Sequence, residues 1–190
     1  MKKPAWRTAV PVLAVAIVGT VGGCSDPEPV QTAPTSSETT AATMSVDPAA
    51  RLWDPCTLPD SALAAAGINT ATKEKDVAGV AFEGWKVCGW RDTAKTYSFT
   101  VYASEHSIDE VRARTDRTEF SPVRVGSYDG LRYRPAGSSR DSECFISLAV
   151  GRQMVDFNVL NRHTARSVAK EACQETRRLA EALVQNVPAT

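Results

Sequence analysis

The sequence predicts an α+β domain over residues 51–190, in which an antiparallel sheet packs against helices. Several short segments alternate apolar with polar residues, which is the period of a strand with one buried face. The longest stretch with a helical period lies at the C-terminus. Four cysteines in the domain suggest disulfides that hold helices against the sheet. Strands outnumber helices in this pattern, which is typical of an α+β fold.

The N-terminal segment has the organisation of a bacterial lipoprotein signal peptide. Three basic residues precede an apolar stretch at 9–21, and small residues then lead directly to Cys24. A spanning helix needs about 20 apolar residues, and this stretch is shorter. We therefore predict that residues 1–23 are removed and that Cys24 is lipidated. Its acyl chains would hold the protein to the outer, extracytoplasmic face of the cell membrane.

Residues 24–50 form the predicted tether between the lipid anchor and the domain. The segment is rich in Pro, Thr and Ser and has no aromatic residue, so it cannot bury enough apolar surface to fold. A flexible chain of this length spans roughly 30 Å on average. A plain linker is the favoured interpretation, and O-glycosylation of the threonines is the alternative.

The domain is predicted to begin with a short helix directly behind Cys56. Thr57 can cap its free amide groups, Pro59 is tolerated in the first turn, and Asp60 completes a capping box. An alanine-rich turn follows and stops at Gly67, which suits a C-terminal cap.

The first predicted strand covers residues 85–91. Side chains alternate along a strand, so Cys88 and Trp90 share one face and Trp85 lies on the other. Either both faces of the sheet are covered, or one indole is partly exposed and meets a ligand or partner. We favour cover on both faces, with Trp90 packed in the core.

A second strand and a second helix follow. Residues 97–101 alternate as a half-buried antiparallel strand. Ser107 and Glu110 have the spacing of a capping box that starts a short helix. The predicted inner stripe of this helix consists of Ile108, Val111 and Thr115.

The following strands are predicted by alternation and by the turns between them. Asp129-Gly130 is predicted as a hairpin turn, and Gly151-Arg152 suits a second tight turn. The strands beside these turns cover residues 123–125, 131–133, 144–150 and 155–159.

The last element is predicted as a long amphipathic helix from Ala165 to about Asn186. Apolar or small residues recur along it at helical period, and charged residues lie mostly on the other side. Cys173 falls on the apolar stripe and can face the sheet. Pro188 ends the run.

The four cysteines of the domain predict two disulfides, with three possible connectivities. A metal site is disfavoured, because CxxC and HxxxH spacings are absent and His106 and His163 are predicted as solvated surface residues. We favour one pairing from the predicted elements. Its bridges are Cys56–Cys88, between the first helix and first strand, and Cys144–Cys173, between an apolar strand face and the helix stripe.

Composition and motifs limit the function. Residues 51–190 carry 19 basic and 18 acidic residues, a net charge of +1, so nucleic acid is not an expected partner. A nucleophile elbow, a phosphate-binding loop and a zinc helix are all absent from the sequence. No catalytic residue, metal or other cofactor is predicted, and the ligand-binding residues stay unknown. Five arginines are predicted on solvated faces and not in an anion site: Arg112, Arg114, Arg117, Arg132 and Arg134.

In its motifs the chain resembles the actinobacterial lipoproteins grouped as domain of unknown function 3558. The resemblance covers roughly residues 51–190 and adds the lipobox and tether before them. The matching motifs are Asp54-Pro55-Cys56, Gly67, Cys88-Gly89-Trp90, Val123 to Gly126, Cys144, Cys173, Leu179-Ala180 and Pro188. One departure is Glu171-Ala172 before Cys173, where a proline-led cysteine is expected. The resemblance implies an exported, membrane-tethered domain and implies no activity.

Two classes of function stay open. The favoured one is a binding or accessory module of the cell envelope, without catalysis, whose partner is a lipid, a glycan or a protein. The alternative is an envelope hydrolase or transferase with an unrecognised site. An apolar cavity on the sheet would favour the first, and convergent carboxylates or a Ser-His pair in a cleft would favour the second.

Overall fold

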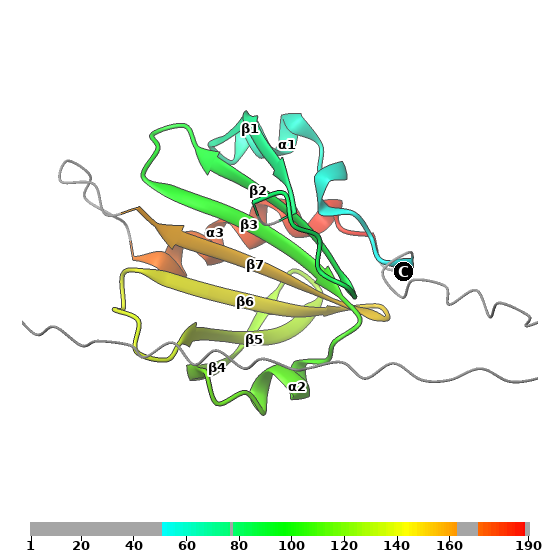
Figure 1. The fold of residues 1–190 in the computed structure, drawn as a ribbon, viewed down its shortest axis with the longest axis vertical. Helices are drawn as coiled ribbons and strands as arrows, with labels where there is room; N and C mark the ends of the chain where they lie inside the picture. Colours follow the sequence, from blue (N-terminus) through cyan, green and yellow to red (C-terminus); the bar gives the residue numbers. More distant parts are fainter. Residues whose placement is uncertain (1–50, 77, 163–170, 189–190) are drawn as a thin grey trace, which may run out of the picture. The chain divides into compact units, whose positions relative to one another are not determined.

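The computed structural model describes residues 51–76, 78–162 and 171–188, so the predictions for Cys24, the tether and His163 lie outside it. The described strands form an antiparallel sheet in the order β1-β2-β3-β7-β6-β5-β4 (Figure 1). The strands are β1 Ile68–Lys75, β2 Trp85–Asp92, β3 Tyr97–Ser104, β4 Arg117–Val125, β5 Tyr128–Pro135, β6 Glu143–Val150 and β7 Gln153–Asn161. The helices are α1 Asp60–Ala65, α2 Ile108–Arg112 and α3 Ala172–Leu183, with 3-10 turns η2 Pro55–Thr57 and η3 Val184–Asn186.

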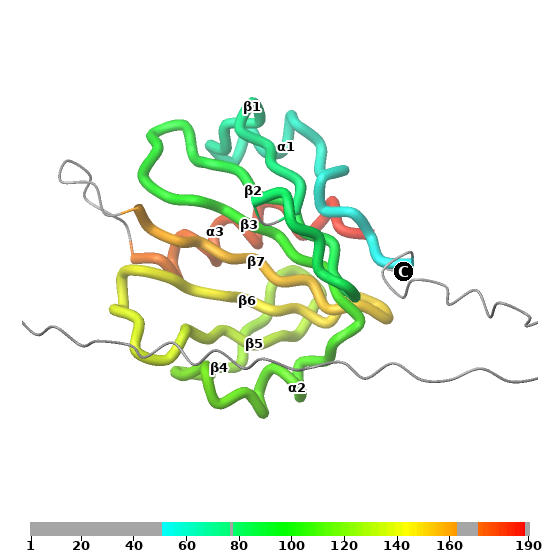
Figure 2. The backbone as a smooth tube through the Cα atoms, in the orientation of Figure 1, coloured from blue at the N-terminus to red at the C-terminus, as the bar shows by residue number. Residues whose placement is uncertain are grey.

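The centre of the sheet joins strands from distant parts of the chain. Figure 2 shows β3 beside β7, and the two pair without a bulge from Tyr97 opposite Asn161 to Ser104 opposite Met154. On the other side β7 pairs with β6 through the tight turn that was predicted at Gly151-Arg152. The predicted alternation at 144–150 and 155–159 is confirmed.

Helices α3 and α1 cover one face of this sheet. In Figure 1 α3 lies behind the strands, where it contacts β6 and β7. Leu179, Ala180 and Leu183 of α3 are completely buried there. The rings of Phe99 and Phe157 lie 6.4 Å apart between centroids in the same core. This helix-covered face is the main hydrophobic core of the domain.

The first helix begins later than predicted. Thr57 ends the 3-10 turn η2, and its hydroxyl donates to the carbonyl oxygen of Asp54 and so does not cap α1. The helix α1 starts at Asp60 behind Pro59, which makes no side-chain cap. Gly67 follows the helix with φ +83°, the left-handed conformation that is usual for a glycine directly after a helix.

Strand β1 was not predicted. Its only buried residue is Ile68, and most of the other side chains are exposed. The pairing with β2 is interrupted by a bulge between Asn69 and Glu74. An edge strand that buries one side chain and contains a bulge has no regular alternation to read.

The hairpin between β4 and β5 turns three residues earlier than predicted. Val125 pairs with Tyr128, so the turn consists of Gly126 and Ser127, and Gly126 has φ +59°. Gly130 lies inside β5 opposite Leu148. A Cβ atom there would lie 2.1 Å from the carbonyl oxygen of Ser147 on β6, so the glycine permits close strand pairing.

The predicted capping box of α2 is confirmed. The Ser107 hydroxyl accepts from the Glu110 amide, and the Glu110 carboxylate accepts from the Ser107 amide. Val111 is buried, whereas Thr115 is exposed beyond the end of the helix. The helix α2 therefore ends before Thr115, the last residue of the predicted inner stripe.

Helix α3 is also shorter than the predicted long helix. Glu171 has extended backbone angles, and its carboxylate accepts from the Gln174 amide, so it is the N-cap and the helix starts at Ala172. Residues 165–170 of the predicted run lie outside the described residues. Val184 to Asn186 continue α3 as the 3-10 turn η3, and Pro188 follows.

Both predicted disulfides are present. Cys56 on η2 is bonded to Cys88 on β2, with Cα atoms 5.2 Å apart. Cys144 on β6 is bonded to Cys173 on α3, with Cα atoms 5.0 Å apart. Each bridge therefore ties a helical segment to the sheet, as the predicted pairing required.

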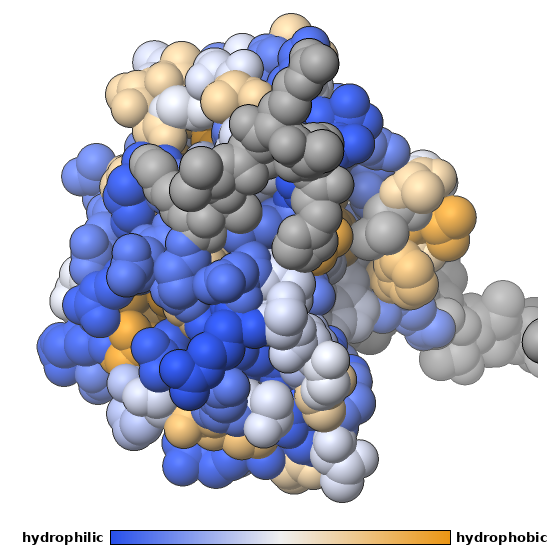
Figure 3. Space-filling view, turned by 90° about the vertical axis from the view of Figure 1, so that its left-hand side faces the viewer, coloured by the Kyte–Doolittle hydropathy of each residue, from blue (hydrophilic) through white to orange (hydrophobic). Residues whose placement is uncertain are grey.

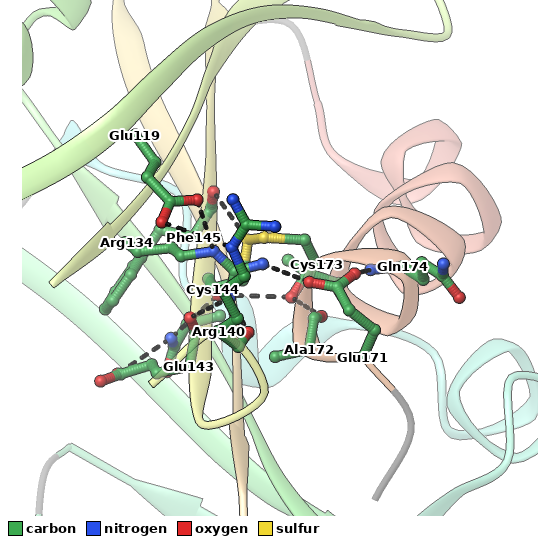
Figure 4. The surroundings of a disulfide bond; sticks show 12 residues. Glu119, Arg134, Arg140, Glu143, Cys144, Phe145, Glu171, Ala172, Cys173 and Gln174 are labelled. Atoms are coloured by element: carbon green, nitrogen blue, oxygen red, sulfur yellow. Dashed lines mark hydrogen bonds and ion pairs between the residues drawn. A yellow bond between two sulfur atoms is a disulfide. The ribbon is translucent and has the colours of Figure 1, made fainter. Parts of the chain in front are cut away.

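Arg134 lies beside the second disulfide and links three segments (Figure 4). Its guanidinium forms an ion pair of 3.3 Å with Glu119 of β4 and a second ion pair with Glu171. It also donates to the carbonyl oxygen of Glu143, at 3.2 Å. Burial opposes the shift, but hydrogen bonds from Arg134 and from backbone amides lower the pKa of Glu171. This arginine thus fixes the N-terminus of α3 against the sheet.

The side of the domain seen in Figure 3 is largely hydrophilic, with apolar residues in small separate patches. None of the helices in the described ranges is long and apolar enough to cross a membrane.

Candidate functional site

The face of the sheet opposite α3 and α1 carries a second, smaller apolar cluster. Its buried members are Val111, Leu131, Tyr133, Phe145 and Met154, and Trp85, Tyr102, Ile108 and Phe120 pack against it partly buried. The short helix α2 contributes Val111 and contacts β6. Because α2 is only five residues long, it leaves part of this face uncovered. We call it the open face of the sheet.

A pocket of about 490 Å³ lies on the open face. Ligand pockets of proteins range from about 300 to about 1,000 Å³ and are lined mainly by apolar and aromatic side chains with a few polar groups. This pocket has that composition. Its apolar lining consists of Phe82, Trp85, Val87, Tyr102, Val111, Tyr133, Phe145 and Met154, and its polar lining consists of His106, Glu110, Arg114, Arg117 and Asp156.

Aromatic rings form two walls of the pocket. On the β2–β3 side, the Trp85 ring lies 6.2 Å from the Tyr102 ring, edge to face, and 5.1 Å from the imidazole of His106. On the β5–β6 side, the Tyr133 and Phe145 rings stack at 5.3 Å. Flat, rigid walls of this kind give apolar contact at a low cost in side-chain entropy.

Arg117 covers the second wall. Its guanidinium carbon lies 5.1 Å from the centroid of the Phe145 ring and 5.9 Å from that of Tyr133, which is cation–π geometry. It also forms an ion pair of 3.4 Å with Asp116. The Nε atom of Arg117 is buried and has no hydrogen-bond partner among the residues that the structure describes.

Asp156 lies on the central strand β7 and lines the pocket. The register places Tyr102 of β3 on one side of it and Ser147 of β6 on the other. The residue is 4% exposed, and within the described ranges its Oδ1 atom has no hydrogen-bond partner. Burial raises its pKa from 3.8 to about 6, although a hydrogen bond from Ser147 and the charge of Arg117 oppose the shift.

The remaining polar groups lie at the α2 side of the pocket and are paired. Arg114 donates to the Asp116 carboxylate at 2.8 and 2.7 Å, and this hydrogen bonding lowers the pKa of Asp116 to about 2. His106 lies 3.6 Å from the Glu110 carboxylate. Hydrogen bonds from the backbone and hydroxyl groups of Ser107 lower the pKa of Glu110. These groups are engaged with one another, unlike Asp156 Oδ1.

The structure corrects several predictions about the site. Trp85 and Trp90 lie on opposite faces, as predicted, but the cover of the open face is incomplete and the half-buried Trp85 lines the pocket. His106 is exposed, as predicted, and its ring packs on Trp85. Arg134 is buried in the ion-pair network of Figure 4, contrary to the solvated face predicted for it.

Arg117 is a second arginine that was wrongly assigned to a solvated face. Its side chain is 20% exposed, because it lies over the aromatic wall of the pocket. Arg112, Arg114 and Arg132 are exposed as predicted, and Arg114 also lines the pocket.

Sequence reasoning did not find Asp156. The signal was present, because Val155, Phe157 and Val159 mark one buried face and Met154 and Asp156 must then share the other. A carboxylate in the middle of a strand is ordinary on a solvated face, so the pattern alone gave no reason to single it out.

No group of three or more histidine, cysteine or acidic side chains with the geometry of a metal site is found in the described part of the chain. The cysteines there are joined in the two disulfides and cannot bind metal as thiolates.

Comparison with known proteins identifies the family but no activity. No curated protein and no solved structure matches the chain. The family model described as "Protein of unknown function (DUF3558)" matches residues 19–186, which is most of the chain. Because this match covers most of the chain and includes the cysteines of both disulfides, the chain belongs to the DUF3558 family.

Proposed function

We propose that this domain is a non-catalytic binding module of the cell envelope that takes a small, largely apolar molecule in the pocket of the open face. The observation that carries the proposal is the pocket itself, which has aromatic walls and a buried, partly unpartnered carboxyl group. A strand-supported, mainly apolar pocket with convergent polar groups and a buried carboxyl of raised pKa is the usual organisation of a small-molecule site. This lining suits a lipid-like ligand better than a glycan, which needs many hydrogen-bonding groups.

A neutral naphthylamine dye, N-phenyl-1-naphthylamine, tests this proposal. We expect its fluorescence to rise on binding, and Trp85→Ala should weaken the affinity about three- to tenfold through loss of an aromatic wall. Trp53→Ala is the matched control, because Trp53 is also half-buried but packs against the helix-covered core. Equal dye binding by both variants and the unmodified chain would place the dye elsewhere and refute the proposed site.

The alternative of an envelope hydrolase or transferase would use the Asp156 carboxyl as a general acid or base. As far as the structure describes it, the lining contains no serine, threonine, cysteine or lysine, so its candidate nucleophiles are carboxylate, imidazole and phenol groups. Apolar and aromatic side chains nevertheless make up most of the lining, which is the feature expected of a binding module. Binding without catalysis is therefore the function that these residues support best.

We also propose that Cys24 anchors the protein to the outer face of the membrane and that residues 24–50 tether the domain to the anchor. The basic head, the apolar stretch and the small residues before Cys24 support this proposal, as does the resemblance to actinobacterial lipoproteins. Cys24→Ala should move the protein from the membrane fraction to the soluble fraction or the medium. If the variant still sediments with membranes after a high-salt wash, the anchor is not a lipid on Cys24.

A further inference from the structure

Two buried polar atoms in the pocket lack partners within the described part of the chain, and they are of opposite kinds. Asp156 Oδ1 is a hydrogen-bond acceptor, and Arg117 Nε is a donor. A buried polar atom without a partner destabilises the folded state relative to one that is satisfied. Both residues line the same pocket, and the charge of Arg117 acts on Asp156. A ligand group that donates and accepts would match this pair.

The charges of the pocket argue against a charged ligand. Two carboxylates, Glu110 and Asp156, and two guanidinium groups, Arg114 and Arg117, line it. An anion would meet the buried Asp156 carboxyl, and a cation would meet the Arg117 guanidinium that covers the aromatic wall. An uncharged group avoids both repulsions.

The Asp156 carboxyl can reach a ligand with a small adjustment. The Oδ1 atom is shielded from solvent, and the residue as a whole is 4% exposed. The χ2 torsion of aspartate is broad and roughly two-fold, so a rotation can present either oxygen to the pocket. Ser147 lies directly beside Asp156 on β6 and is completely buried, which limits how far the carboxyl can move.

From these observations we infer that the ligand is an uncharged molecule with a flat apolar body and a hydroxyl group, and that this hydroxyl donates a hydrogen bond to Asp156. The apolar body lies between the Trp85–Tyr102 wall and the Tyr133–Phe145 wall. Asp156 is thus a specificity residue for the hydroxyl group. The inference depends on the proposed binding function and adds the chemical class of the ligand.

Four probes with a common naphthalene body test this inference on the purified full chain. They are 2-naphthol, a neutral donor; 2-methoxynaphthalene, neutral without a donor; 2-naphthoate, an anion; and 2-naphthylmethylammonium, a cation. Dissociation constants are measured at neutral pH by calorimetry or by titration of amide resonances. We expect 2-naphthol to bind about tenfold or more tightly than 2-methoxynaphthalene, because a hydrogen bond to a carboxylate is lost in the methoxy compound.

Variants then connect the preference to Asp156. Asp156→Leu should bring the affinities of 2-naphthol and 2-methoxynaphthalene within about twofold of each other. Asp129→Asn, at an exposed carboxylate of β5 outside the pocket lining, should leave the preference unchanged. If Asp156→Leu does not fold, as judged by circular dichroism, the comparison of probes on the unmodified chain still decides the question.

The possible outcomes separate the two proposals. Equal binding of 2-naphthol and 2-methoxynaphthalene would overturn the inference about the hydroxyl group and leave the binding function intact. Tightest binding of the anion or of the cation would also overturn it, since the ligand would then be charged. Failure of all four probes to bind would overturn the binding function itself together with the inference.

Discussion

Because the carboxyl of Asp156 is buried, the free energy of unfolding of the domain should decrease as the pH rises through the weakly acidic range. The pKa of this buried carboxyl is about 6 in the folded protein, against 3.8 for a solvated aspartate. The folded state therefore binds more protons than the unfolded state between these values, and the free energy of unfolding falls as the pH increases. Each pKa unit corresponds to about 1.4 kcal/mol, so the ionised form costs about 3 kcal/mol. This cost is absent below about pH 4 and complete above about pH 7.

Asp156→Asn removes this dependence while it keeps the shape of the side chain. The difference in unfolding free energy between variant and unmodified protein should shift by about 2 kcal/mol in favour of the variant from about pH 4.5 to about pH 7.5. Urea denaturation at a series of pH values measures it. Other shifted groups, such as Glu143 and Glu171, are present in both proteins and cancel in the difference.

The control for this measurement is Asp129→Asn, because that carboxylate is 79% exposed. Its profile should run parallel to that of the unmodified protein. Parallel profiles for Asp156→Asn as well would refute the reasoning, since the carboxyl would then ionise in the folded state as easily as in water. A shift of the opposite sign would mean that the neighbouring guanidinium groups stabilise the carboxylate more than burial destabilises it.

Four further predictions concern the stability of the fold. Replacing Cys144 and Cys173 together by alanine should lower the free energy of unfolding by about 3 to 4 kcal/mol, because the bridge closes a loop with a sequence separation of 29; urea denaturation measures the loss. Gly130→Ala should destabilise the fold by about 1 to 3 kcal/mol or prevent folding, because its Cβ atom would lie 2.1 Å from a β6 carbonyl oxygen. Gly89→Ala is the control and should cost less, because its nearest atom would lie at 3.7 Å. Similar thermal midpoints for the two variants would contradict the close approach at Gly130. Ser107→Ala should cost about 0.5 to 2 kcal/mol by removing the cap of α2, and an unchanged urea midpoint would show that α2 needs no cap. A chelator should leave the thermal midpoint unchanged, and a large decrease would reveal a structural metal.

Strong local patterns in the sequence were sufficient to predict several helices and strands. Residues 144–150 and 155–159 alternate because one face of β6 and β7 is completely buried, and every second residue there must be apolar. The capping box at Ser107 depends on two residues three positions apart, so it can be read directly from the chain. The disulfide pairing followed from the same information, since Cys144 and Cys173 each lie on an apolar face.

Weaker local signals were misread where tertiary contacts decided the outcome. The Asp129-Gly130 pair is typical of a hairpin turn, but the turn formed at Gly126 because Gly130 must lie against β6. Helix α3 was predicted to start at Ala165, yet it starts at Ala172. There the N-cap Glu171 forms an ion pair with Arg134, a residue distant in sequence, and no helical period reveals such a partner.

The sequence by itself determined the α+β class, most strands and both disulfides, because each depends on which residues are apolar along a short segment. Only the tertiary structure decided that the open face carries a pocket and that Asp156 lines it. The residues of that face come from six strands and from α2, and the length of α2 sets how much of the face stays uncovered. The charge state of Asp156 depends in turn on burial by these distant segments, which no local pattern records.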